Sequence, residues 1–250
     1  MFLVYCSLII YNSLLELLYL VRSKQVKKAT IFKNIIILFV SFLLYSIVQL
    51  LYFYPTKVQN ILKISSTGFV VLVIIVTVLA ILLLIYLYHK QLAEENDWDF
   101  NYRPHWSIRR LAIAIIGFVL LTLASFLIPN LLGINVNTTS DNQMELNRIS
   151  RLAGNFFVPM VVIIAPIFEE TIFRGMFFNT FFVKETVLNK WLGIIISGFA
   201  FGYVHNPAFS PFLLVYWSLG CVLGWVYITT KDMRYSMLSH MLYNALGFLV

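Results

Sequence analysis

Charged residues are scarce in this sequence: Asp, Glu, Lys and Arg make up only 12% of its 250 residues, whereas 60% are hydrophobic. A soluble domain carries about 25% charged and roughly 45–50% apolar residues, so a water-soluble globule could not bury this much apolar side chain. Disordered chains are poor in apolar residues and rich in charge, which excludes disorder as well. The composition therefore predicts a polytopic integral membrane protein.

Cysteine is scarce too, because the chain has only Cys6 and Cys221, and both lie in apolar runs. Such a pair predicts no disulfide framework. No internal repeat, low-complexity segment or long linker is visible in the sequence. No basic residue precedes the first apolar run and no small-x-small cleavage site follows it, so we expect no cleavable signal peptide.

Long apolar runs are abundant instead. A bilayer core about 30 Å thick needs around 20 apolar residues of helix, and four such runs are plain: 2–21, 35–54, 67–89 and 111–133. Further helical stretches are expected at roughly 156–183, 190–206, 212–230 and 236–250. Pro159 and Pro166 interrupt the fifth stretch, which predicts a kinked or broken helix packed inside protein. The expected fold is an all-α, polytopic transmembrane helical bundle of about eight helices.

The basic residues are distributed unevenly between alternate connections. The first connection holds Arg22, Lys24, Lys27, Lys28 and Lys33, and the positive-inside rule places it in the cytoplasm. With alternation from there, only four of the 18 Lys and Arg residues face outward: Lys57, Lys63, Arg148 and Arg151. This asymmetry explains the net charge of +7 without a nucleic-acid partner. We expect a multi-pass cell-membrane protein, surrounded by the lipid bilayer, with its N-terminus outside.

Polar residues elsewhere fall into two groups. The stretches 90–107 and 134–151 are expected to be solvated loops. Within the first four apolar runs the one acid is Glu16, which we expect to snorkel or pair near the basic connection. Titratable residues inside spans are costly and mark functional sites. Most of them lie in the last hundred residues, where we therefore expect the chemistry.

Two adjacent acids stand in the fifth helical stretch. Glu170 and Arg174 are four residues apart, so they share a helix face and can form an ion pair. Glu169 is rotated about 100° away from that pair. One carboxylate is thus neutralised by the arginine, while its neighbour remains available for general acid–base chemistry. We expect Glu170 and Arg174 to be structural and Glu169 to be functional.

Two further helices each present one polar face. His205 ends an apolar helix, and Phe201 lies one turn before it on the same face, where the ring can wall the imidazole. His240 and Asn244 share a face at the same spacing and can donate hydrogen bonds to a developing oxyanion. Hydrogen bonding between helices is the structural alternative for these side chains. Three polar faces in an otherwise apolar bundle predict a single buried site.

If the helices are straight, the residue spacing places the three candidate residues at different depths below the cytoplasmic surface. At about 1.5 Å per residue, Glu169 and His205 lie farther from the flanking basic residues than His240 does. Either residues 231–239 include a re-entrant or extended segment, or the assumed loop boundaries are inexact.

These elements resemble the CPBP intramembrane proteases, also called the Abi or CAAX-protease family. The family's pattern is Glu-Glu-x-x-x-Arg, Phe-x-x-x-His and His-x-x-x-Asn in that order. It stands here as Glu169 and Glu170 with Arg174 and Gly175, Phe201 with His205, and His240 with Asn244. The resemblance covers residues 155–250, whereas 1–154 resembles nothing beyond apolar helices. We therefore expect about four N-terminal transmembrane helices followed by a catalytic core.

The resemblance implies a membrane-embedded endopeptidase related to the Ras-converting CAAX endopeptidase and to lysostaphin-resistance-type proteins. Its substrate would be a peptide or protein close to the membrane. Carried over, Glu169 activates a water with help from His205, and His240 and Asn244 stabilise the oxyanion. Glu170, Arg174 and Phe201 would support them. In bacteria the family is linked to peptide maturation and bacteriocin self-immunity, and nothing in the sequence indicates a prenylated substrate.

Other chemistries and functions fit the sequence less well. A glutamate with two histidines could hold zinc, but the pattern is more similar to a metal-independent glutamate mechanism, so no cofactor is expected. Ser197-Gly198 lacks the context of a serine intramembrane protease, and Asp232 is the only aspartate after Asp141, which disfavours an aspartyl site. A non-catalytic immunity or sensor-partner protein of the same fold remains the alternative. A small transporter is a weaker one, because no inverted repeat is visible.

Overall fold

The computed structural model describes residues 28–102, 104–135 and 138–249, and all regular structure within these ranges is helical. The expected helix 2–21, with Cys6 and Glu16, lies outside the described residues. The described helices are α2 (Lys28–Phe53), α3 (Pro55–Leu62), α4 (Ser66–Glu94), α5 (Ile108–Leu131), α6 (Asp141–Ala153), η1 (Gly154–Phe156), α7 (Phe157–Pro159), η2 (Met160–Ile164), α8 (Ala165–Glu170), η3 (Thr171–Met176), α9 (Phe177–Phe181), α10 (Val187–His205), α11 (Pro211–Thr230) and α12 (Met233–Leu246).

Six helical segments are long and apolar enough to cross a bilayer, which confirms the all-helical, multi-pass prediction. They are Thr30–Phe53, Ser66–Glu94, Ile108–Leu131, Asp141–Phe181, Val187–His205 and Pro211–Thr230. The last helix, α12, has 14 residues, fewer than the roughly 20 that a span requires.

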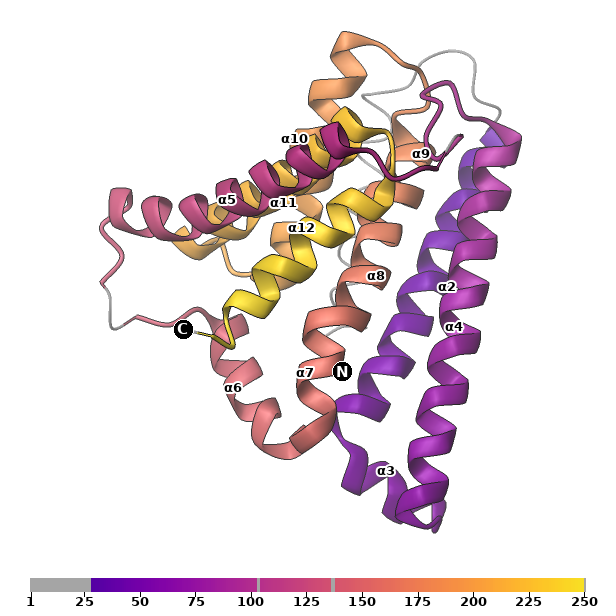
Figure 1. The fold of residues 1–250 in the computed structure, drawn as a ribbon, viewed down its shortest axis with the longest axis vertical. Coiled ribbons are helices and arrows are strands. Elements are labelled where there is room, and N and C mark those ends of the chain that lie inside the picture. Colours follow the sequence, from indigo (N-terminus) through magenta and orange to yellow (C-terminus); the bar gives the residue numbers. More distant parts are fainter. Residues whose placement is uncertain (1–27, 103, 136–137, 250) are drawn as a thin grey trace.

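The helices lie in two differently inclined groups (Figure 1). Helices α2 and α4 run side by side along one edge, and the segment from α7 to α9 lies next to them. Helices α5, α11 and α12 pack against one another and slant across the other side of that segment. The segment from α7 to α9 therefore lies between the N-terminal pair and the slanted group.

This central segment departs from regular α-geometry, as the two prolines predicted. Residues 160–164 and 171–176 form π-helical turns, in which the N–H of each residue bonds to the carbonyl five residues earlier rather than four. Pro159 and Pro166 flank the first of these turns. The backbone groups that such irregular turns release need partners from neighbouring helices.

The two stretches expected to be solvated loops differ in outcome. The expectation was wrong for 134–151, whereas residues 95–102 and 104–107 do form a loop, although not a wholly solvated one. Part of 134–151 forms α6, where the Ser140 hydroxyl accepts a hydrogen bond from the N–H of Gln143 as an N-cap. Within 90–107, Trp98 and Phe100 are fully buried. The Trp98 indole donates to the carbonyl of Phe182, and the Phe100 ring stacks on Tyr227. Polar composition concealed an N-capped helix in one stretch and two core aromatics in the other.

Helices α10 and α11 cross closely because glycines meet at the crossing. An added Cβ on Gly220 would lie 2.6 Å from the backbone oxygen of Gly198. An added Cβ on Gly198 would lie 2.8 Å from the backbone nitrogen of Cys221. Both neighbours are backbone atoms, so the steric clash of an added methyl group can be relieved only if the two helices move apart. Small residues at such contacts are the usual way for membrane helices to approach closely.

We predict that Gly220→Ala lowers the stability of the protein by roughly 1–3 kcal/mol, because the methyl group forces the two helices apart. Gly224→Ala is the matched control on the same helix, since its added Cβ would meet no atom closer than 3.5 Å. The measurement is thermal unfolding of the purified proteins in detergent. Equal midpoints for the two variants would contradict the close crossing.

Candidate active site

Three helices bring Glu169, His205 and His240 together. The carboxylate Oε2 of Glu169 lies 3.9 Å from the Nε2 of His205 and 3.7 Å from the Nε2 of His240. Glu169 belongs to α8, His205 is the last residue of α10, and His240 lies in α12. Both distances exceed a direct hydrogen bond and suit a small bridging molecule. Glu169 is 8% exposed and His240 is 5% exposed, whereas the His205 side chain is 18% exposed.

Glu169, His205 and His240 lie together, so the difference in depth expected for straight helices is absent. Residues 233–239 are helical, so the suggestion of an extended or re-entrant segment before His240 was wrong. The central helix ends at Phe181 and contains two π-helical turns, and α12 slants across it (Figure 1). A count that assumes straight, parallel α-helices cannot reproduce this arrangement.

Glu170 and Arg174 form the expected ion pair, and the pair also holds one histidine. Arg174 donates to Glu170 Oε1 over 2.9 Å, and the same oxygen lies 2.9 Å from Nδ1 of His240. The guanidinium also donates to the backbone carbonyl of Gly220 in α11. Glu170 and Arg174 are both 0% exposed. Because a carboxylate only accepts, Nδ1 of His240 carries a proton.

The other histidine is held through backbone and aromatic contacts. Nδ1 of His205 lies 2.8 Å from the carbonyl oxygen of Phe201, which also can only accept, so the proton of a neutral His205 is on Nδ1 and Nε2 is free to accept. The Phe201 ring lies 4.2 Å from the His205 ring and 5.8 Å from the His240 ring. It also covers the Arg174 guanidinium at 4.5 Å. The Phe201 ring thus lies beside the paired arginine and both imidazoles.

Asn244 lies one turn after His240 and has a backbone partner. Its side-chain nitrogen donates to the carbonyl of Val161 over 2.9 Å. In the π-helical turn that carbonyl would accept from residue 166, but Pro166 has no N–H. Asn244 therefore supplies the hydrogen bond that the proline cannot. Its amide retains a second N–H.

One residue at the site was missed by the sequence analysis. The hydroxyl of Tyr45, in α2, lies 2.6 Å from Glu169 Oε1, and both groups are buried. The signal available in the sequence was a hydroxyl group inside an apolar run, which does not indicate a partner more than a hundred residues away. The other two histidines do not join the site: His105 lies in the loop before α5, where its carbonyl accepts from Tyr235, and the His89 ring lies beside that of Tyr88.

The arrangement combines a carboxylate, an accepting imidazole nitrogen and hydrogen-bond donors in an enclosed space. These are the parts of a general-base site with an oxyanion-stabilising side. Among the described residues, no group of three or more His, Cys, Asp and Glu side chains is placed so that it could hold a metal ion.

Comparison with known proteins finds a similarity for the C-terminal part of the chain. Residues 152–246 match the model of the family described as Type II CAAX prenyl endopeptidase Rce1-like. This segment is therefore similar to CAAX proteases. It contains every site residue above except Tyr45.

Several curated bacterial proteins are similar to part of this chain. UPF0177 protein YaiF of Lactococcus lactis is 37% identical over 46% of this chain and 50% of its own length. UPF0177 protein YvdC of the same organism is 27% identical over 54% of this chain and 51% of its own. Membrane-embedded CAAX protease MroQ of Staphylococcus aureus is 28% identical over 55% of this chain and 56% of its own. The chain thus spans about half the length of these curated relatives. No solved structure matches it.

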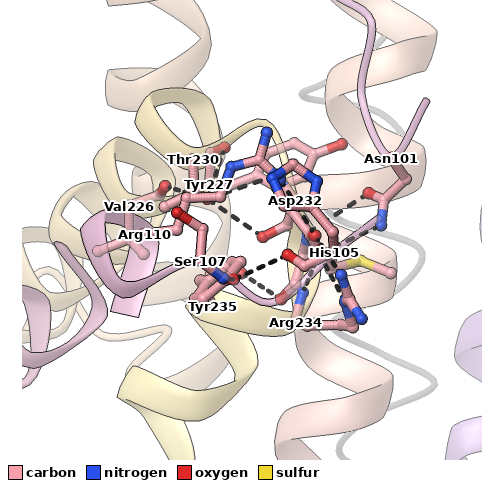
Figure 2. A network of polar contacts seen from close by, with 12 residues as sticks. Asn101, His105, Ser107, Arg110, Val226, Tyr227, Thr230, Asp232, Arg234 and Tyr235 are labelled. Atoms are coloured by element: carbon pink, nitrogen blue, oxygen red, sulfur yellow. Dashed lines mark hydrogen bonds and ion pairs between the residues drawn. The ribbon is translucent and has the colours of Figure 1, made fainter. Parts of the chain in front are cut away.

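A polar network holds the beginning of α12, the helix that brings His240 and Asn244 to the candidate site (Figure 2). The buried Asp232 carboxylate accepts from the N–H of Arg234, which caps the helix, and pairs with the Arg234 guanidinium at 2.7 Å. Arg110 of α5 lies 3.6 Å from the same carboxylate. The Tyr235 hydroxyl donates to the carbonyl of His105 and accepts from the N–H of Ser107. The network thereby joins α12 to the loop before α5.

We predict that Asp232→Ala destabilises the protein by roughly 2–4 kcal/mol, because it removes a helix cap and leaves the arginines without their buried partner. Glu145→Gln is the control, since Glu145 pairs with Arg148 on the exposed surface of α6, where an ion pair is worth at most about 1 kcal/mol. Thermal unfolding in detergent measures both. A loss for Asp232→Ala no larger than that of the control would contradict the anchoring role of the network.

Proposed function

We propose that the protein is a membrane-embedded endopeptidase that cleaves peptide or protein substrates with a water molecule activated by Glu169. The observation that carries the proposal is the placement of Glu169 Oε2 within 4 Å of two imidazole Nε2 atoms in an enclosed site. The match of residues 152–246 to the model of a family of CAAX endopeptidases supports the same reaction class.

The hydrogen bonds of the two histidines suit different roles. Nε2 of neutral His205 accepts, and so does the Glu169 carboxylate, so a water between them donates one hydrogen to each and directs a lone pair at the substrate carbonyl. Nδ1 of His240 is committed to Glu170. For His240 to donate through Nε2 as well, both of its ring nitrogens must be protonated.

The charges of the buried cluster fit a doubly protonated His240. Glu169 and Glu170 contribute two negative charges, and Arg174 contributes one positive charge. A positive imidazolium at His240 completes a neutral cluster, which is the favourable state in a low-dielectric interior. Its Nε2–H and the second amide N–H of Asn244 then serve as donors to the oxyanion.

The reaction proceeds in two steps. The water oxygen bonds to the substrate carbonyl carbon while one water proton passes to Glu169 Oε2, and the oxyanion that forms accepts hydrogen bonds from His240 and Asn244. The carbon–nitrogen bond then breaks as Glu169 returns its proton to the leaving amine. Glu169 ends as a carboxylate, ready for the next water. No step requires a metal ion.

In the cell this activity would serve peptide maturation or bacteriocin self-immunity. The distribution of basic residues favours a topology in which the N-terminus faces outward. The competing function is a non-catalytic immunity or sensor-partner protein of the same fold. Site variants separate the two, because a binding protein does not need the acid–base chemistry of Glu169.

We predict that Glu169→Gln and His205→Ala, made separately, each reduce substrate cleavage by at least about 100-fold, the typical contribution of a general base. The measurement is mass spectrometry of labelled protein N-termini in cells that express the wild type or a variant. N-termini that appear only with the wild type identify cleavage products.

Glu94→Gln is the matched control, since Glu94 forms an exposed ion pair with Lys33 away from the site. It should leave the product pattern unchanged. Wild-type cleavage or immunity in both site variants, at normal membrane levels, would overturn the protease proposal in favour of the binding function.

Metal chelators should change the activity of the purified protein less than about twofold, because Glu169 and His205 activate water without a Lewis acid. The test is product formation with and without 1,10-phenanthroline, using a substrate peptide identified in the cellular experiment. A zinc protease assayed in the same detergent is the control and should be inhibited. Inhibition that zinc restores would show that the reaction uses a metal.

A further inference from the structure

We propose that Tyr45 is a positioning residue for Glu169: its hydroxyl holds one carboxylate oxygen so that the other faces the two imidazoles. This inference rests on the proposed function and adds to it a residue of α2, outside the segment that matches the CAAX-protease family. Tyr45 acts through Glu169 and not on the substrate.

The two carboxylate oxygens of Glu169 have different surroundings. Oε1 lies 2.6 Å from the Tyr45 hydroxyl, whereas Oε2 faces the Nε2 atoms of His205 and His240. An ionised carboxylate only accepts hydrogen bonds, so the Tyr45 hydroxyl is the donor. Charge-assisted bonds of this kind are short and strong. Rotation of the carboxylate, which would exchange the two oxygens, breaks this bond.

The Tyr45 ring is held in place by its own packing. It stacks on Phe168, the residue before Glu169, with ring centroids 5.1 Å apart and an angle of 12° between the planes. The residue is 5% exposed. One turn earlier in α2, the Ser41 hydroxyl lies 3.3 Å from the sulfur of Met176 in η3. These contacts seat α2 against the central segment on both sides of the catalytic turn, so the hydroxyl has little freedom to leave the carboxylate.

The Tyr45 hydroxyl donates to the ionised carboxylate of Glu169, because a carboxylate only accepts hydrogen bonds. Glu169 must be ionised to accept the proton of water. The charged and titratable groups that face Glu169 are Glu170 and Arg174 on its own segment, His205 of α10, His240 of α12 and Tyr45 of α2. Among these groups the Tyr45 hydroxyl lies within direct hydrogen-bond distance of the Glu169 carboxylate, whereas the two imidazole Nε2 atoms lie 3.9 and 3.7 Å away.

The inference can be tested without a substrate. Dicyclohexylcarbodiimide reacts with the protonated form of a carboxyl group in apolar surroundings and leaves a stable mass adduct. The purified full-length protein is treated with this reagent between pH 5 and pH 9, and mass spectrometry measures the modified fraction of the peptide that contains Glu169. Glu169→Gln identifies the adduct that belongs to this residue.

We predict that Tyr45→Phe shifts the midpoint of Glu169 labelling upward by about one pH unit, because one hydrogen bond to the charged form is lost. The substitution keeps the ring that stacks on Phe168. Tyr52→Phe is the matched control: Tyr52 is a buried tyrosine of the same helix whose hydroxyl bonds to Thr77. Its midpoint should remain that of the wild type.

An unchanged midpoint in Tyr45→Phe would overturn the inference. So would an equal shift in Tyr52→Phe, or new labelling of Glu170, because either result indicates general loosening of the bundle and not the loss of one bond. The outcome is separate from that of the proposed function. A missing shift removes the role of Tyr45 alone, whereas the absence of any wild-type-dependent cleavage in cells removes the protease proposal alone.

Discussion

The site depends on one ion pair inside an apolar bundle. Glu170 and Arg174 are both inaccessible to solvent, and an unpaired charge there would cost several kcal/mol. Both charges have hydrogen-bond partners on neighbouring helices. The arginine donates to the Gly220 carbonyl of α11, and the glutamate bonds to His240 of α12. The Phe201 ring of α10 covers the guanidinium. The need to satisfy two charges thus gathers three helices around the turn that carries Glu169.

The parts of the site that follow helical spacing could be predicted, and the parts that depend on folding could not. The four-residue intervals from Glu170 to Arg174 and from Phe201 to His205 are local, and the structure places both pairs in contact. Their assembly with His240 was expected because polar faces are rare in the chain. Tyr45 has no such relation to Glu169, since only the packing of α2 against α8 brings them together. Asn244 was expected near an oxyanion, but its bond to Val161 depends on a π-helical turn that no spacing indicates.

The fold shows a similar division. Apolar runs located the described spans because length and hydropathy are what a bilayer demands. The same reasoning misjudged 134–151, where an N-cap at Ser140 was a better guide than polarity. It also missed the burial of Trp98 and Phe100, which alternate with polar residues in the sequence yet pack against the end of the central helix. Depth was misjudged because helix tilt and π-helical turns are set by neighbours and not by residue counts.

The absent N–H of Pro166 has a mechanical consequence. The Asn244 side chain takes the place of that N–H as the donor to the Val161 carbonyl. A hydrogen bond between α12 and the central helix therefore replaces one within the central helix. Sliding of α12 along the central helix would strip a backbone carbonyl of its partner in an apolar interior, at a cost of roughly 1–3 kcal/mol. Even a small displacement of α12 along the axis of the central helix therefore costs free energy. The proline, usually considered a source of flexibility in membrane helices, here sets the register between two of them.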